Sequence, residues 1–197
     1  MNIISMSLYG NNPFYCLGAV ENAKLVPIVY PEWKMRVYVG AEVDGNIVNT
    51  LNDLGCEILP HNQWPGMFWR FLAADDAQAD YAIFRDADSR LNIRERVAVD
   101  QWIESGKVAH IMHDHPEHQW PILGGMWGIK CRFLNMRDQI DSWCSHGLCN
   151  DTYGNDCWFL MGRILPLIEG SAVKHGNNDM SFPDHPPYDG FVGKPIV

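Results

Sequence analysis

Short apolar segments alternate with amphipathic segments along most of the chain. The apolar segments are four to eight residues long and are bounded by Gly, Pro, Asn or Asp, which is typical of buried strands. The predicted strands span residues 2–8, 35–39, 56–59, 81–85, 108–112 and 126–129. The segments with helical spacing of apolar residues span 14–25, 44–54, 68–74, 93–105 and 156–165. In the helix 93–105 we expect Val97, Val99, Trp102 and Ile103 to face inward, with Asn92 as N-cap. Asn155 or Asp156 could cap the last helix.

Strands that alternate with helices favour an α/β fold, a sandwich with a mainly parallel central sheet. Ligands of open α/β sheets bind at the carboxyl ends of strands. No linker, repeat or low-complexity tract divides the chain, so we expect one domain over residues 1–197. The segment from about residue 181 is rich in Pro, His and Gly, and is expected to be a loop-like tail able to fold over a site.

Composition narrows the possible partners. The formal net charge of −9 and the pI near 5.2 argue against binding to nucleic acid or to an anionic membrane. The first residues resemble no signal peptide, and Gly162, Arg163 and Pro166 interrupt the most apolar later stretch, so no transmembrane segment is expected. The six cysteines form no C-x-x-C pair; we interpret them as reduced thiols and predict a cytoplasmic protein.

The segment Asp86-Ala87-Asp88 carries the clearest candidate chemistry. It follows a predicted buried strand, and side chains two residues apart in extended backbone point to the same side. Two carboxylates so placed can share one Mg²⁺ or Mn²⁺ ion, leaving other positions for water and phosphate oxygens. A solvated turn or a helix cap is the alternative interpretation of a lone Asp-x-Asp.

Other polar residues lie at predicted element ends. Asp114 follows a strand, inside a His113/His115/His118 spacing that offers a weak zinc-hydrolase alternative. Gly124 and Gly125 precede a strand and would let backbone approach a ligand closely. The remaining candidates are Asp156 beside a reacting group, His175 as a nitrogen ligand, and Arg70 and Lys194 as phosphate contacts.

Taken together, these segments resemble the GT-A glycosyltransferases, which are nucleotide-sugar-dependent enzymes. The chain is similar more narrowly to small viral and bacterial members, such as the N-terminal domain of a chlorovirus capsid glycosyltransferase. The matching segments are 7–11, 66–73, 84–90, 114–116, 124–128 and 153–156. In this order they are spread from about residue 3 to about residue 175, so the resemblance covers most of the chain. The resemblance implies a GT-A three-layer α/β sandwich that transfers a sugar from a nucleotide-diphosphate donor, expected to be a UDP-sugar, to a glycan or other hydroxyl acceptor.

The resemblance also implies residue roles. Leu8, Tyr9 and Gly10 would line the nucleotide-base pocket. Asp86 and Asp88 would hold Mn²⁺ or Mg²⁺ across the donor diphosphate, with His175 as the third protein ligand. Asp156 would lie beside the transferred sugar. Cys157 and Gly176 depart from the residues that often follow the last acid and the ligand histidine in such enzymes.

The stereochemical course stays open at this level. A retaining enzyme, which the resemblance favours, needs no strong general base, whereas an inverting enzyme needs a carboxylate near the acceptor hydroxyl. Asp114 and Asp156 are the candidates for that role.

Two other classes compete with this interpretation. A haloacid-dehalogenase-type phosphohydrolase also places Asp-x-Asp after a strand, although Arg85 before the motif and Ser89-Arg90 after it do not fit that pattern. A non-enzymatic carbohydrate-binding module would stack sugars on Trp69, Trp120 and Trp127.

Overall fold

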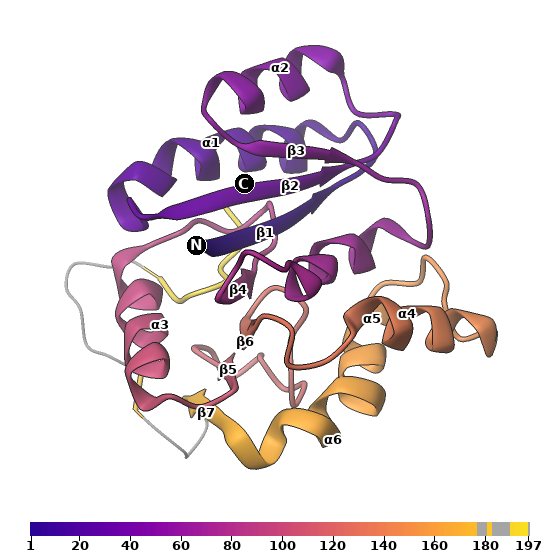
Figure 1. Ribbon diagram of the computed structural model, residues 1–197. Coiled ribbons are helices and arrows are strands. Elements are labelled where there is room, and N and C mark those ends of the chain that lie inside the picture. The colour runs from indigo at the N-terminus through magenta and orange to yellow at the C-terminus, as the bar shows by residue number, and fades with distance from the viewer. Residues whose placement is uncertain (177–180, 183–189, 197) are drawn as a thin grey trace.

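The computed structural model describes residues 1–176, 181–182 and 190–196 (Figure 1). Within them the chain forms a seven-stranded sheet in the order β3-β2-β1-β4-β6-β5-β7. The strands are β1 (Asn2–Leu8), β2 (Trp33–Val39), β3 (Glu57–Pro60), β4 (Tyr81–Phe84), β5 (Ala109–Met112), β6 (Trp127–Lys130) and β7 (Ala172–His175). Every strand predicted from the sequence is present, with ends shifted by a residue or two.

The sheet is mainly parallel, as predicted. Parallel pairs join β1 to β2, β1 to β4, β2 to β3 and β5 to β7. Only β6 runs against its neighbours, β4 and β5. The start of β6 therefore lies beside the end of β4, because Phe84 pairs with Trp127.

Helical segments cover both faces of the sheet, which makes the three layers (Figure 1). On one face pack α1 (Pro13–Val29), α2 (Gly45–Asp53) and α3 (Ile93–Ser105). On the other lie the 3-10 segment η1 (Gly66–Asp75), α4 (Met136–Ser145), α5 (Asn155–Phe159), the π-helical segment η2 (Leu160–Ile164) and α6 (Leu165–Ile168), followed by the short η3 (Glu169–Ser171). Each face has its own buried apolar cluster.

The alternation of side chains along β1 connects the two layers. Ile4, Met6 and Leu8 are buried against the α1 side. Ser5 and Ser7 point to the opposite face, as a period of two requires, and bond the backbone of η1. β1 therefore alternates apolar residues, which pack toward α1, with serines, which bond the backbone of η1.

Helix α3 begins and ends largely as expected. The side chain of Asn92 accepts a hydrogen bond from the Glu95 amide at 2.9 Å, and Gly106 ends the helix in the left-handed conformation. The buried face consists of Ala98, Val99 and Trp102 together with Glu95. Val97 and Ile103 are only half-buried, so the inward face is rotated from the predicted one.

Several predictions need correction. Residues 68–74 lie in a 3-10 segment, and the helix expected over 156–165 is split between α5 and η2. Its N-cap is Gly154, with no side-chain cap, so the prediction of Asn155 or Asp156 as N-cap is wrong. Both lie inside the helix, where Asn155 donates to the Leu148 carbonyl and Asp156 accepts from Arg70. Helix α4 and strand β7 were not predicted, since α4 has few apolar positions and β7 has two polar residues, Lys174 and His175, among its four.

The cysteines also differ from expectation in part. Cys144 and Cys149 form a disulfide across the end of α4, so the prediction of six reduced thiols is wrong for this pair. Cys16, Cys56, Cys131 and Cys157 are free and buried.

Candidate active site

The candidate site lies where three strand ends meet. β1 ends at Leu8 and continues into Tyr9 and Gly10, and β4 leads into Asp86-Ala87-Asp88. Gly124 and Gly125 come just before β6, whose antiparallel direction brings them to the same edge. The topology therefore assembles residues that are more than 100 positions apart in the sequence.

Arg70 is the centre of this assembly. Its side chain is buried and lies between two carboxylates: Nη1 pairs with Asp86, and Nη2 donates to Asp156 Oδ2 at 2.7 Å. The backbone of Arg70 is fixed by β1, because its amide donates to Ser7 Oγ at 2.9 Å and its carbonyl accepts from Ser5 Oγ at 2.7 Å. Burial opposes its charge, but Asp86 and Asp156 hold the pKa of Arg70 above its usual value.

Gly124 and Gly125 lie directly against these charged groups. A Cβ atom on Gly124 would overlap Asp156 Oδ2, and one on Gly125 would overlap Asp86 Oδ2. Any larger residue would displace a carboxylate. The two glycines are therefore required by close packing against these carboxylates, and their predicted approach to a ligand stays a prediction.

Asp88 lies close enough to Asp86 for their charges to interact. Burial raises the pKa of Asp88, and the negative charge of Asp86 raises it further. A divalent cation between the two carboxylates would remove this repulsion, so the pair fits Mg²⁺ or Mn²⁺ as two hard oxygen donors. Within the described part of the chain, no three His, Cys, Asp or Glu side chains form a ready metal-binding group.

Helix α1 holds the acidic loop in place. Asn22 is fully buried and its side chain donates to the Ser89 carbonyl at 2.8 Å while accepting from the Leu91 amide at 3.0 Å. Gly18 packs so tightly that a Cβ there would overlap the carbonyl oxygen of Ala87. Sequence reasoning missed both residues; a polar Asn on the apolar side of a predicted helix was the only signal.

Tyrosines form the rim of the site. Tyr9 packs edge-on against Trp69 with ring centroids 5.8 Å apart, and burial raises its pKa, with Asp156 and Asp86 contributing. The pKa of Tyr15 is also raised, by burial first and then by the negative charges of Asp88 and Asp86. Of the predicted base-pocket residues, Leu8 is buried, while the Gly10 amide donates to Glu42 at 2.8 Å.

Asp114 lies in a different arrangement from the one expected. Both of its oxygens accept from Arg94, at 2.7 and 2.8 Å, and Oδ2 also accepts from the Val192 amide at 2.9 Å. A carboxylate so occupied is not poised as a base, and the structure does not place it with Arg70, Asp86 and Asp156.

His175 is likewise not grouped with the acidic pair. It is fully buried at the end of β7, where one ring nitrogen bonds His110 at 2.7 Å and the other bonds Gln101 at 2.8 Å. Burial lowers the pKa of His175 to about 4. The structure thus gives this histidine two protein partners and no free ring nitrogen for the predicted third-ligand role.

The remaining candidate residues from the sequence are the histidines of the zinc alternative, the tryptophans and Lys194. His113 bonds the Trp120 carbonyl at 2.8 Å, and His115 stacks on Phe191 at 4.0 Å, so these histidines have structural contacts. Trp69 and Trp127 are buried, which removes them as sugar-stacking surfaces. Lys194 is exposed in the tail.

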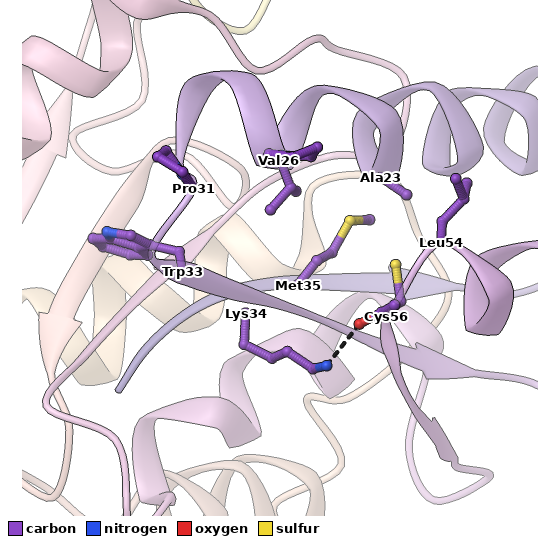
Figure 2. A pocket seen from close by; sticks show the side chains of 10 residues that line it. Ala23, Val26, Pro31, Trp33, Lys34, Met35, Leu54 and Cys56 are labelled. Atoms are coloured by element: carbon purple, nitrogen blue, oxygen red, sulfur yellow. Dashed lines mark hydrogen bonds between the residues drawn. The ribbon is translucent and has the colours of Figure 1, made fainter.

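A cavity of about 250 Å³ lies elsewhere, where β2 and β3 begin (Figure 2). Ala23, Val26 and Met35 contribute apolar walls, and Lys34 donates to the Gly55 carbonyl at 2.7 Å. None of the predicted site residues lines it.

No family model and no curated protein matches the sequence. In structure the chain is similar to the galactosyltransferase LgtC in complex with donor and acceptor sugar analogues, with a TM-score of 0.55 and 13% identity over 89% of this chain and 73% of that one. It is also similar to glucosyl-3-phosphoglycerate synthase from Mycobacterium tuberculosis in complex with Mn²⁺, UDP-glucose and glycerol 3-phosphate (TM-score 0.51, 14% identity, covering 87% and 69%).

A third similar structure is a cytidylyltransferase from Leptospira borgpetersenii (TM-score 0.54, 10% identity, covering 89% and 76%). These neighbours establish the fold of the chain, which is the GT-A sandwich of glycosyltransferases that was expected. At such low identity the reaction has to be argued from the site.

Proposed function

We propose that this protein is a metal-dependent glycosyltransferase that moves a sugar from a nucleotide-diphosphate donor to a hydroxyl acceptor. The observation that carries the proposal is the buried Arg70 bridge between Asp86 and Asp156, framed by Gly124 and Gly125 at the carboxyl ends of the central strands. This position is where ligands of open α/β sheets bind.

Asp86 and Asp88 would hold the cation, Mn²⁺ or Mg²⁺. When bound, the cation supplies charge stabilisation to a departing nucleoside diphosphate. The glycosyltransferase-fold neighbour with Mn²⁺ and UDP-glucose bound supports this assignment. An acidic protein with net charge −9 also needs a local positive charge to accept an anionic donor.

The protein's own groups orient the reactants. Arg70 fixes Asp86 and Asp156, so neither carboxylate has to reorganise when the donor binds. Asp156 then faces the transferred sugar. The oxygens of Asp114 accept from Arg94, and those of Asp156 accept from Arg70 and the Cys157 amide, so neither carboxylate is free to act as a strong base. A retaining enzyme needs no such base, and we favour retention of configuration.

Aromatic side chains support a carbohydrate acceptor. Tyr153 is 98% exposed and Trp158 is 52% exposed, and both flank Asp156 in sequence. Trp158 packs against Trp120 with centroids 4.8 Å apart. Flat aromatic faces of this kind stack on the apolar face of a sugar ring, which fits a glycan or glycoconjugate acceptor.

Two further expectations belong to this proposal. We infer that the donor is a UDP-sugar and that the narrower relatives are small enzymes such as the chlorovirus capsid glycosyltransferases. A cytoplasmic site of action stays a prediction. Among the residues that the structure describes, no helix has the length and apolar character needed to cross a membrane.

A thermal-shift screen tests the proposal. We expect UDP to raise the melting temperature in the presence of Mn²⁺ but not in EDTA, and Asp88→Ala to lose that rise while keeping its own melting temperature. Stabilisation by CTP with release of pyrophosphate from CTP and a sugar phosphate would favour a cytidylyltransferase instead. Hydrolysis of a generic phosphomonoester would favour the phosphohydrolase, and glycan binding that ignores chelator and nucleotide would favour the binding module.

A further inference from the structure

Residues 190–196 of the tail are bonded to the rest of the protein at two points, which we call anchors. The Val192 amide donates to Asp114 Oδ2 at 2.9 Å, and the Ile196 amide donates to the carbonyl of Asp88 at 2.9 Å. Ile196 follows Val192 by four positions in the chain, so the two points are at most about 14 Å apart. The segment 190–196 therefore runs directly from Asp114 to the acidic loop.

Packing holds the same segment down. Val192 is fully buried in a small cluster with Ala98, Met112 and Met126. Gly193, in the left-handed conformation, lies against Met126, where a Cβ would come within 2.6 Å of the sulfur. Met126 follows Gly125, so the tail touches the segment that packs on Asp86.

Asp114 has the geometry of an anchor. Arg94, near the start of α3, grips it with two parallel hydrogen bonds, which is the strongest arrangement for such a pair. Arg94 also lies over the ring of Phe182 at 4.6 Å, and that ring contacts His175. The Asp114 side chain is 8% exposed, so its bond to the Val192 amide is shielded from water.

We propose that Asp114, held by Arg94, is a positioning residue that fastens the tail segment 190–196 across the Asp86-Ala87-Asp88 loop. Lys194 is exposed and lies midway in sequence between the two attachment points, so the anchor holds it on the segment that reaches the acidic loop, where the proposed donor diphosphate would bind. This role replaces the general-base role for Asp114, and it rests on the proposed function only where donor binding is concerned.

Amide hydrogen exchange tests the anchor without any ligand. We expect Asp114→Ala to speed exchange across 190–196 at least about tenfold, because the Val192 amide loses its partner. Asp100→Ala is the matched control: Asp100 accepts two hydrogen bonds from Arg96 on the same helix, and no contact joins it to the described tail residues. Unprotected Val192 in the wild-type protein, or unchanged exchange in Asp114→Ala, would overturn the anchor. Arg94→Lys provides a second variant should Asp114→Ala fail to fold.

Calorimetry with UDP and Mn²⁺ tests the consequence for the donor. We expect Asp114→Ala to weaken UDP binding about tenfold, and to weaken it far less in a Lys194→Ala background, because both changes act through the tail. Asp114→Glu should restore part of the affinity. A general base would leave UDP affinity unchanged and lower only turnover, by about a hundredfold or more, and that outcome would overturn the proposal. Absence of UDP binding in the wild-type protein would count against the proposed function, while exchange would still decide the anchor.

Discussion

At the scale of single residues, the site is governed by charge balance around Arg70. Arg70 pairs with Asp86 and Asp156, and Arg90 also acts on Asp88, so the three carboxylates still exceed the two guanidinium charges and leave negative charge for a cation to neutralise. The acidic pair could be predicted from sequence because it is local. The Arg70–Asp156 contact could not, because the two residues are 86 positions apart and neither has a distinctive neighbourhood.

Arg70→Met tests the bridge. It leaves the Asp156 carboxylate, 10% exposed, without its charged partner, and we expect a loss of about 3–5 kcal/mol in the free energy of unfolding by urea. Asp156→Asn in the same background should regain part of that loss, because the uncompensated charge is gone. Equal stability of Arg70→Met and the double variant would contradict the charge argument.

At the scale of elements, the position of the acidic loop depends on how closely α1 packs. Gly18 and Asn22 are one helical turn apart and contact the loop backbone directly. The hydrophobic pattern predicted α1 but not this polar contact, since pattern analysis assigns faces and says nothing about which backbone atoms meet.

Gly18→Ala tests that packing. Its Cβ would overlap the Ala87 carbonyl, which has no flexible end that could move away, so we expect about 1–3 kcal/mol of destabilisation and weaker binding of UDP with Mn²⁺. Gly45→Ala is the control, because Gly45 lies at the start of α2 with nothing within 4 Å of the added methyl group. Similar behaviour of the two variants would show that α1 does not fix the loop.

The arrangement of the strands in the sheet is also something that pattern analysis of the sequence does not predict. Six of the seven strands, all but β7, were recognisable one by one, and the α/β class followed from their alternation with helices. The reversed direction of β6 was not recognisable, because a short strand pattern such as Trp127–Lys130 does not encode which way the strand runs in the sheet. That direction is what brings Gly124 and Gly125 to Asp86, so the site depends on a feature that no local pattern encodes.

At the scale of the whole molecule, a buried histidine pair couples β5, β7 and α3. Burial lowers the pKa of His110 well below its usual value, with the neighbouring His175 and Arg85 adding to the effect, and burial lowers that of His175 to about 4. Both are neutral in the fold and become protonated in the unfolded chain near pH 6.5. Stability is therefore complete above about pH 6.5 and declines as the pH falls toward about 4.

Urea unfolding at pH 7 and pH 5 measures this effect. We expect the wild-type protein to lose more stability between the two than His175→Gln does, by an amount on the order of 1 kcal/mol. His146→Gln, at an exposed position, should behave like the wild type. An identical pH dependence for His175→Gln and the wild type would exclude the histidine pair as the cause.

The central claim is that a cation held by Asp86 and Asp88 joins the protein to the donor diphosphate. The most direct test is turnover of a UDP-sugar by purified protein in excess EDTA, then after restoring Mn²⁺, for the wild type and Asp88→Ala. The account predicts no turnover in EDTA, full recovery with Mn²⁺ in the wild type, and no recovery in Asp88→Ala. Equal UDP binding and sugar transfer in EDTA would contradict it.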